Sequence, residues 1–245
     1  MKTVVSFVLL MSMFIYTGCS SSAKKLYQKQ SLTIIPASPD SLYPPSDFVV
    51  SYHTDFTKKH YPERIIEFKK HPLEFGDIVF LGNSLTEHGG DWAKRLNIPT
   101  IKNRGIAGDV TYGVLQRLNE IWFYKPTAVF ILIGINDMFV DSLSAGYIAG
   151  NVIKIAEVIH RKSPNTKLYV QTILPTSNLN LIAKIKAVND QLKRNAGSHT
   201  CSLIDLHAAF ADENDMIKKE LTNDGVHLTE AAYNLWVSIV SKYLK

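Results

Sequence analysis

The sequence Ile78-Val79-Phe80-Leu81-Gly82-Asn83-Ser84-Leu85-Thr86 joins a short apolar run to a glycine and a polar turn. An apolar run of this length without polar alternation is typical of a strand that is buried on both faces of a parallel sheet. In such sheets, ligands bind outside the carboxyl ends of the strands. Ser84 therefore lies where chemistry is expected, although a serine at this position is also a common helix cap.

The rest of the chain after residue 75 repeats this texture, because apolar runs of strand length alternate with segments of helical period. The predicted strands cover residues 78–81, 100–103, 128–133, 168–174 and 202–206. Among the segments of helical period, one starts near Thr111, and two others cover 148–159 and 231–243. This alternation predicts an α/β fold, with a central five-stranded parallel sheet between two helical layers and right-handed crossovers.

Composition narrows the function classes. The chain has 245 residues, of which 46% are hydrophobic and 20% charged, so it can bury one sizeable core. Its net charge of +5 comes from scattered basic residues rather than a stripe, which argues against nucleic-acid binding. No apolar stretch reaches the roughly 18 residues that a membrane-spanning helix needs.

The N-terminal segment has the parts of a secretion signal: Lys2, a mostly apolar run over 4–16, and Thr17-Gly18-Cys19, which resembles a bacterial lipobox. We expect a signal peptide over 1–18, a lipidated Cys19, a tether over 19–25 and hence an exported, membrane-anchored lipoprotein on the periplasmic or cell-surface face. The alternative is an ordinary signal peptide that is cleaved nearby. Residues 26–75 are expected to form a proline-containing extension with one short helix over 63–70. Cys201 starts an apolar run and is expected to be an inert, buried thiol.

Three more polar segments lie where the predicted sheet presents its carboxyl edge or just before the last helix. They read Asn103-Arg104-Gly105-Ile106-Ala107-Gly108-Asp109, Gly134-Ile135-Asn136-Asp137 and Asn223-Asp224-Gly225-Val226-His227. Each segment alone is explained by an ordinary turn. Together with the Ser84 segment, they bring a hydroxyl, a backbone donor, an amide donor and an Asp/His pair to one edge, in a form suited to nucleophilic catalysis.

These four segments resemble the blocks of the GDSL or SGNH hydrolase family, including the branch of platelet-activating-factor acetylhydrolase catalytic subunits and bacterial carbohydrate O-acetylesterases. The resemblance covers residues 76–245 and implies a flavodoxin-like hydrolase domain that needs no metal and no cofactor. It implies that Ser84 is the nucleophile, His227 the base and Asp224 the residue that orients the base. The Ser84 amide, Gly108 and Asn136 would form the oxyanion hole. Asn83 departs from the family pattern, which has Asp there, but this position supports the turn more than the chemistry.

The loops after the third and fourth strands are short and carry no long amphipathic lid, which favours a small acyl group, and we expect this group to be acetyl. We expect substrate contacts from Asn83, Arg104, Met138 and Asn178, and the asparagines suit a sugar. Arg104 would either meet an acidic sugar such as sialate or be a surface cation. His88 would either reach the pocket or remain a surface residue.

The leading hypothesis is a carbohydrate or sialate O-acetylesterase that forms an acyl-enzyme on Ser84 and acts on a small-molecule or glycan ester. One alternative is a lysophospholipase or thioesterase that acts on lipid acyl esters. Another is a non-catalytic lipoprotein that binds glycans through an inherited fold. The sequence does not determine the oligomeric state.

Overall fold

The computed structural model describes residues 39–195 and 200–244. The expected signal peptide, Cys19, the tether and the first residues of the extension lie outside these described ranges. The described residues all belong to one compact unit. Within the described ranges, no helix combines the length and the hydropathy that a membrane span requires.

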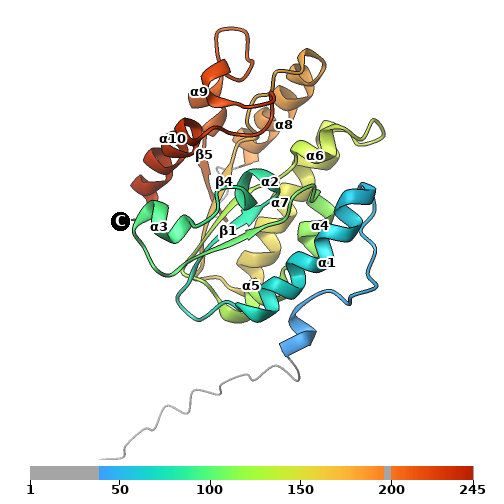
Figure 1. The fold of residues 1–245 in the computed structure, drawn as a ribbon, viewed down its shortest axis with the longest axis vertical. Helices are drawn as coiled ribbons and strands as arrows, with labels where there is room; N and C mark the ends of the chain where they lie inside the picture. The colour runs from blue at the N-terminus through green and yellow to red at the C-terminus, as the bar shows by residue number, and fades with distance from the viewer. Residues whose placement is uncertain (1–38, 196–199, 245) are drawn as a thin grey trace, which may run out of the picture. The chain divides into compact units, whose positions relative to one another are not determined.

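A five-stranded parallel sheet with strand order β2-β1-β3-β4-β5 lies at the centre of this unit (Figure 1). Its strands are β1 (Ile78–Gly82), β2 (Ile101–Gly105), β3 (Ala128–Leu132), β4 (Lys167–Gln171) and β5 (Ser202–Ile204). Gly82 at the end of β1 pairs with Gly105 and Leu132, so the first three strands end level with one another. The strand order reverses at β1 and β3, which is where ligands bind in sheets of this order. The predicted α/β fold and its five strands are confirmed.

Helices cover both faces of the sheet (Figure 1). One face carries α3 (Trp92–Leu96) and α10 (Glu230–Val240), and the other carries α4 (Thr111–Gln116), α5 (Asn119–Tyr124), α7 (Ala145–Lys162) and α8 (Ile182–Asn195). On the first face, the Phe80 ring of β1 stacks on Trp92 at 4.4 Å between ring centroids, and Trp92 contacts Trp236 of α10 at 4.9 Å. The described residues also form short helical elements: η1 (Pro39–Leu42), α2 (Ser84–Glu87), α6 (Ile135–Met138), η2 (Leu179–Leu181), α9 (Leu206–Phe210), η3 (Lys219–Leu221) and η4 (Ser241–Tyr243).

The helix that was expected from Thr111 is two helices, α4 and α5. Arg117 separates them because its backbone leaves helical geometry at φ −117° and ψ 28°. Its buried guanidinium donates to the Gly82 and Arg104 carbonyl oxygens, at 2.9 and 2.8 Å. The interruption therefore ties this region to the ends of β1 and β2.

The N-terminal extension contains a longer helix than the sequence suggested, α1 (Asp55–Lys70). Thr54 caps its N-terminus, since the Thr54 Oγ1 accepts from the Thr57 N–H at 3.2 Å, and the helix continues through Pro62. Its buried apolar side chains join a second, smaller core with the loop that follows β2; this core consists of Leu42, Tyr43, Val50, Tyr61, Ile65, Phe68, Ile106 and Val110. The described part of the extension is thus packed against one of the loops at the carboxyl edge of the sheet.

Candidate active site

Ser84 is the first residue of α2, directly after β1 and its turn. Asn83 forms this turn, since its Oδ1 accepts from the Leu85 N–H at 3.1 Å. The first N–H groups of a helix have no partner within the helix. The Ser84 amide therefore lies beside its own hydroxyl as an available donor.

Ser84, His227 and Asp224 form a chain of hydrogen bonds, although the serine lies 143 residues before the histidine. Ser84 Oγ lies 3.2 Å from His227 Nε2, and His227 Nδ1 lies 2.7 Å from Asp224 Oδ2. Asp224 Oδ1 also accepts from the backbone N–H groups of His227 and Val226, at 2.7 and 2.9 Å. With Nδ1 donating to the carboxylate, Nε2 can accept the proton of the Ser84 hydroxyl.

The electrostatics of this chain keep Asp224 ionised. The hydrogen bond from the His227 ring is the main cause that lowers the pKa of Asp224 to about 2, and the backbone donors act in the same direction. The carboxylate therefore carries its negative charge throughout the neutral range. It can stabilise a positive charge on the imidazole after proton transfer.

Gly108 lies in the loop after β2 with a left-handed backbone, at φ +78°. A Cβ at this position would overlap Thr57 Oγ1, a fully buried side chain of α1. Within the described residues, the Gly108 amide has no protein acceptor, so it is available to a ligand. Both the backbone conformation and the contact with α1 require glycine here.

Asn136 lies in α6, shortly after β3, beside the segment that contains Gly108. Its Nδ2 donates to the Asp109 carbonyl oxygen at 2.8 Å. A primary amide has two N–H donors, so the second remains for a ligand. The neighbouring Asp137 is fully buried and accepts from the Thr111 N–H and hydroxyl, which joins α6 to the start of α4.

His88 is close to the proposed base. Its ring centroid lies 5.3 Å from that of His227. Burial lowers the pKa of His88, and the positive charge that His227 can carry lowers it further. The sequence left two interpretations open for His88, and the structure combines them, because the residue is exposed and its ring also lies beside that of His227.

Three of the four predicted substrate contacts are wrong, because the residues concerned are buried. Met138 is 2% exposed and packs in the main core, so it does not line a wall for substrate. Asn83 is also buried and acts in the turn. Asn178 is exposed and caps η2, with its Oδ1 accepting from the Asn180 N–H at 3.0 Å.

Arg104 is neither a substrate contact nor a surface cation, because it is 4% exposed. Its guanidinium donates to both carboxylate oxygens of Glu120, at 2.8 and 2.9 Å, and to the His71 carbonyl oxygen. Its guanidinium carbon also lies 4.6 Å from the centre of the Phe68 ring of α1. Arg104 therefore holds the extension to the domain and is not available to an acidic sugar.

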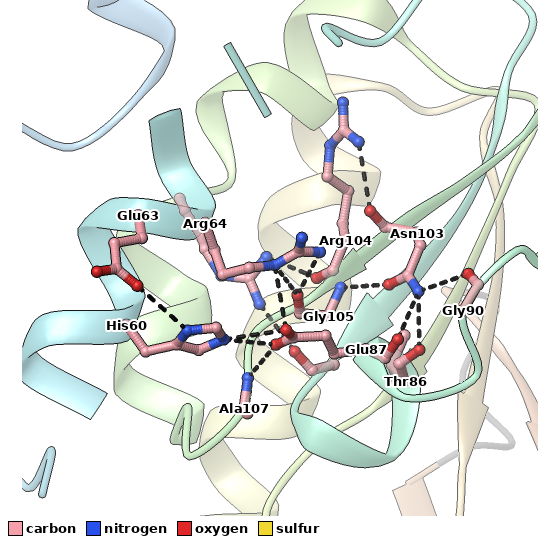
Figure 2. A network of polar contacts seen from close by, with 12 residues as sticks. His60, Glu63, Arg64, Thr86, Glu87, Gly90, Asn103, Arg104, Gly105 and Ala107 are labelled. Atoms are coloured by element: carbon pink, nitrogen blue, oxygen red, sulfur yellow. Dashed lines mark hydrogen bonds and ion pairs between the residues drawn. The ribbon is translucent and has the colours of Figure 1, made fainter. Parts of the chain in front are cut away.

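Sequence reasoning missed the residues that support the Gly108 loop from α1 and α2. Thr57 contacts Gly108. His60 and Arg64 bind the carboxylate of Glu87 (Figure 2). This carboxylate also accepts from the Ala107 N–H. The signal that could have found them is the spacing 57, 60 and 64, which puts three polar side chains on one face of a helix. Ahead of the helix, His53 lies 3.0 Å from Asp109 Oδ1 and supports the same loop.

Other chemistry-bearing groups lie apart from this edge. Cys201 is half-buried, and burial raises the pKa of its thiol. Across 39–195 and 200–244, no three His, Cys, Asp or Glu side chains gather in a way that could hold a metal ion.

Comparison with known proteins gives a consistent result. A family model described as "GDSL-like Lipase/Acylhydrolase family" matches residues 80–235. The human and rat platelet-activating factor acetylhydrolase IB subunit alpha2 are each 28% identical to this chain over 165 residues, which is 64% of this chain and 71% of the relative.

Two solved structures share the fold. A GDSL-like lipase from Bacteroides thetaiotaomicron has a TM-score of 0.64 at 22% identity, covering 77% of this chain and 96% of the other. A carbohydrate esterase family 3 protein from Talaromyces cellulolyticus has a TM-score of 0.55 at 19% identity, covering 69% and 96%.

Proposed function

This chain belongs to the GDSL-like lipase/acylhydrolase family, and we propose that it is a serine esterase that removes small acyl groups, acetyl above all, from a carbohydrate. The observation that carries the proposal is the chain of contacts from Ser84 Oγ through His227 to Asp224. A serine hydroxyl is a weak nucleophile until a neighbouring base takes its proton, and this geometry supplies that base.

In the proposed mechanism, Ser84 Oγ attacks the ester carbonyl carbon while its proton passes to His227 Nε2. The carbonyl oxygen becomes an oxyanion, which accepts hydrogen bonds from the Ser84 and Gly108 amides and from Asn136 Nδ2. The intermediate then breaks its bond to the alcohol oxygen, which takes the proton from His227, and leaves an acyl group on Ser84. Water repeats the sequence with His227 as base, and this second step releases the carboxylic acid and restores the serine.

The preference for acetyl rests on the short segments beside the site. Residues 133–144 and 172–181 contain only α6 and η2 as helices before α7 and α8 begin, and neither offers a long cover for an acyl chain. The curated relatives are by name acetylhydrolases, which fits the same preference. The N–H of Ser177 donates to the Gly225 carbonyl oxygen, which holds the neighbouring Asn178 beside the loop that carries Asp224 and His227. Asn178 is exposed, and its amide is suited to a sugar hydroxyl.

A second candidate function, a lysophospholipase or thioesterase, is favoured by exposed apolar side chains on the same two segments. Phe139 is 53% exposed and Leu179 is 69% exposed. Large exposed apolar residues near an ester-cleaving site would suit a lipid chain. The two candidate functions differ in their dependence on acyl length, so they can be separated directly.

Acyl length is the first test. We expect kcat/KM for 4-nitrophenyl acetate to exceed that for the octanoate by at least about 10-fold, because a small site gains no binding energy from extra methylenes and must exclude them. Acetate release from O-acetyl sialic acids and acetylxylan then tests the carbohydrate part. A rate that rises with chain length supports the lipid candidate instead. Failure of Ser84 to react with a fluorophosphonate probe would support the non-catalytic alternative.

The N-terminal segment supports a further part of the proposal, that the protein is exported and anchored in a membrane through a lipid on Cys19. Bacteria that express the full chain and are fed labelled palmitate should produce a labelled protein in the membrane fraction. The Cys19→Ala variant should lose the label, whereas Cys201→Ala should keep it. A wild-type protein that is cleaved and released without label would contradict the anchor.

A further inference from the structure

Glu87 ends the short helix that Ser84 begins, and its carboxylate reaches across to the loop after β2. Its Oε2 accepts from the Ala107 N–H at 2.6 Å (Figure 2). Ala107 directly precedes Gly108, whose N–H is one of the proposed oxyanion donors. One side chain of the nucleophile's helix therefore holds the residue next to that donor.

Two side chains of α1 hold Glu87 in turn. His60 Nε2 lies 3.0 Å from both carboxylate oxygens, and Arg64 Nε lies 3.5 Å from Oε1. Arg64 also donates to the Gly105 carbonyl oxygen, at 3.3 Å from Nη2 and 3.4 Å from Nε. Figure 2 shows these side chains converging from the helix onto the loop. All three are largely buried, which strengthens charged hydrogen bonds relative to those in water.

We propose that Glu87 is a positioning residue, which His60 and Arg64 fix so that the peptide between Ala107 and Gly108 points its N–H at the oxyanion. The inference rests on the proposed esterase function. Three further contacts hold the other side of the same peptide: Thr57 packs on the Gly108 Cα, the Asp109 N–H donates to the Ile106 carbonyl oxygen at 3.0 Å, and Asn136 binds the Asp109 carbonyl oxygen. Glu87 supplies the contact on the Ala107 side.

A purely structural ion pair would affect folding but not the quality of the oxyanion hole, so the test needs a readout of the oxyanion itself. Sulfur accepts hydrogen bonds more weakly than oxygen. An intact oxyanion hole therefore favours an oxygen ester over the matching thionoester, in which sulfur replaces the carbonyl oxygen. The ratio of kcat/KM for 4-nitrophenyl acetate to that for its thionoacetate measures how well the donors are placed.

For Glu87→Ala, we expect kcat for the acetate to fall about 10- to 100-fold with KM changed less than about 3-fold, because a displaced donor weakens the transition state and not ground-state binding. The oxygen-to-sulfur ratio should fall at least about 5-fold. Glu87→Gln keeps an acceptor for the Ala107 N–H but loses the charge that His60 and Arg64 bind. Its kcat and its oxygen-to-sulfur ratio should therefore lie between those of the wild type and of Glu87→Ala. His60→Gln should also shift the ratio, by less than Glu87→Ala.

Glu67→Gln is the matched control, since Glu67 lies on α1 but pairs with the exposed Lys70 and His71. It should leave both rates and the ratio unchanged. An active wild-type protein whose Glu87 variants lose rate equally on both esters, with an unchanged ratio, would overturn the positioning role alone. A wild-type protein that hydrolyses neither ester overturns the esterase function and this inference with it. If Glu87→Ala fails to fold, Glu87→Gln and His60→Gln decide the matter.

Discussion

Ser84→Ala is expected to lower kcat for an acetyl ester by at least about 1000-fold, which is the scale of losing a triad member. Alanine leaves the donors of the Ser84 amide, Gly108 and Asn136 in place but removes the only atom that forms the acyl-enzyme. KM should therefore change little while turnover is lost. What remains would be the slow attack of water on a bound ester whose carbonyl is still polarised.

The measurement is steady-state hydrolysis of 4-nitrophenyl acetate together with labelling by a fluorophosphonate probe. Label should be absent from Ser84→Ala. Ser238→Ala makes the same change on the exposed side of α10, where the hydroxyl donates to the Leu235 carbonyl oxygen, and it should keep both activity and label. A Ser84→Ala protein that retained a tenth of the wild-type turnover would remove the basis of the proposed mechanism.

The sheet and the carboxyl-edge segments could be predicted from the sequence because each rests on local information. Apolar runs such as Ala128–Leu132 are buried along their whole length and show no alternation, which identifies them as central parallel strands. Polar residues that directly follow such strands must share one edge of the sheet. Ser84 and Asn136 belong to this group, and the structure brings both to the edge where His227 lies.

Arg104 shows where local information ends. It lies on a strand among polar neighbours, and nothing near it in the sequence marks it as buried. Its partner Glu120 also accepts from the Tyr43 hydroxyl at 2.8 Å and from the Leu73 N–H at 2.9 Å, two groups that precede it by 77 and 47 residues. A buried charge depends on such distant partners, so strand periodicity alone cannot identify it.

The length of α1 was missed for a related reason. The predicted helix over 63–70 begins directly after Pro62, and proline disfavours a helix interior because it removes a backbone donor. Tertiary packing outweighs this cost here, since Tyr61, Ile65 and Phe68 on either side of the proline are buried in the second core. The same packing brings Thr57 and His60 to the oxyanion loop. The sequence did not reveal where α1 starts, so it did not reveal the contacts that Thr57 and His60 make with the site.

Asp224→Asn is expected to lower kcat at neutral pH by about 1000-fold or more, because it reverses the proton arrangement of His227. Asp224 Oδ1 accepts from two backbone N–H groups, so the oxygen of an asparagine would keep that position. The asparagine NH₂ would then face His227 Nδ1 and donate to it. Nε2 would carry the proton and could not accept the one from Ser84.

Asp224→Ala provides the internal comparison for this argument. Alanine removes the carboxylate charge but leaves Nδ1 free to bind water, so the correct tautomer remains accessible and the loss of rate should be smaller than for asparagine. Asp212→Asn is the matched control: Asp212 Oδ1 also accepts from two backbone N–H groups in a turn, at 2.9 and 3.0 Å, without contacting a histidine ring. It should keep wild-type kcat. Equal losses for Asp224→Asn and Asp224→Ala would show that only the charge of Asp224 matters, and wild-type turnover in Asp224→Asn would remove it from the mechanism altogether.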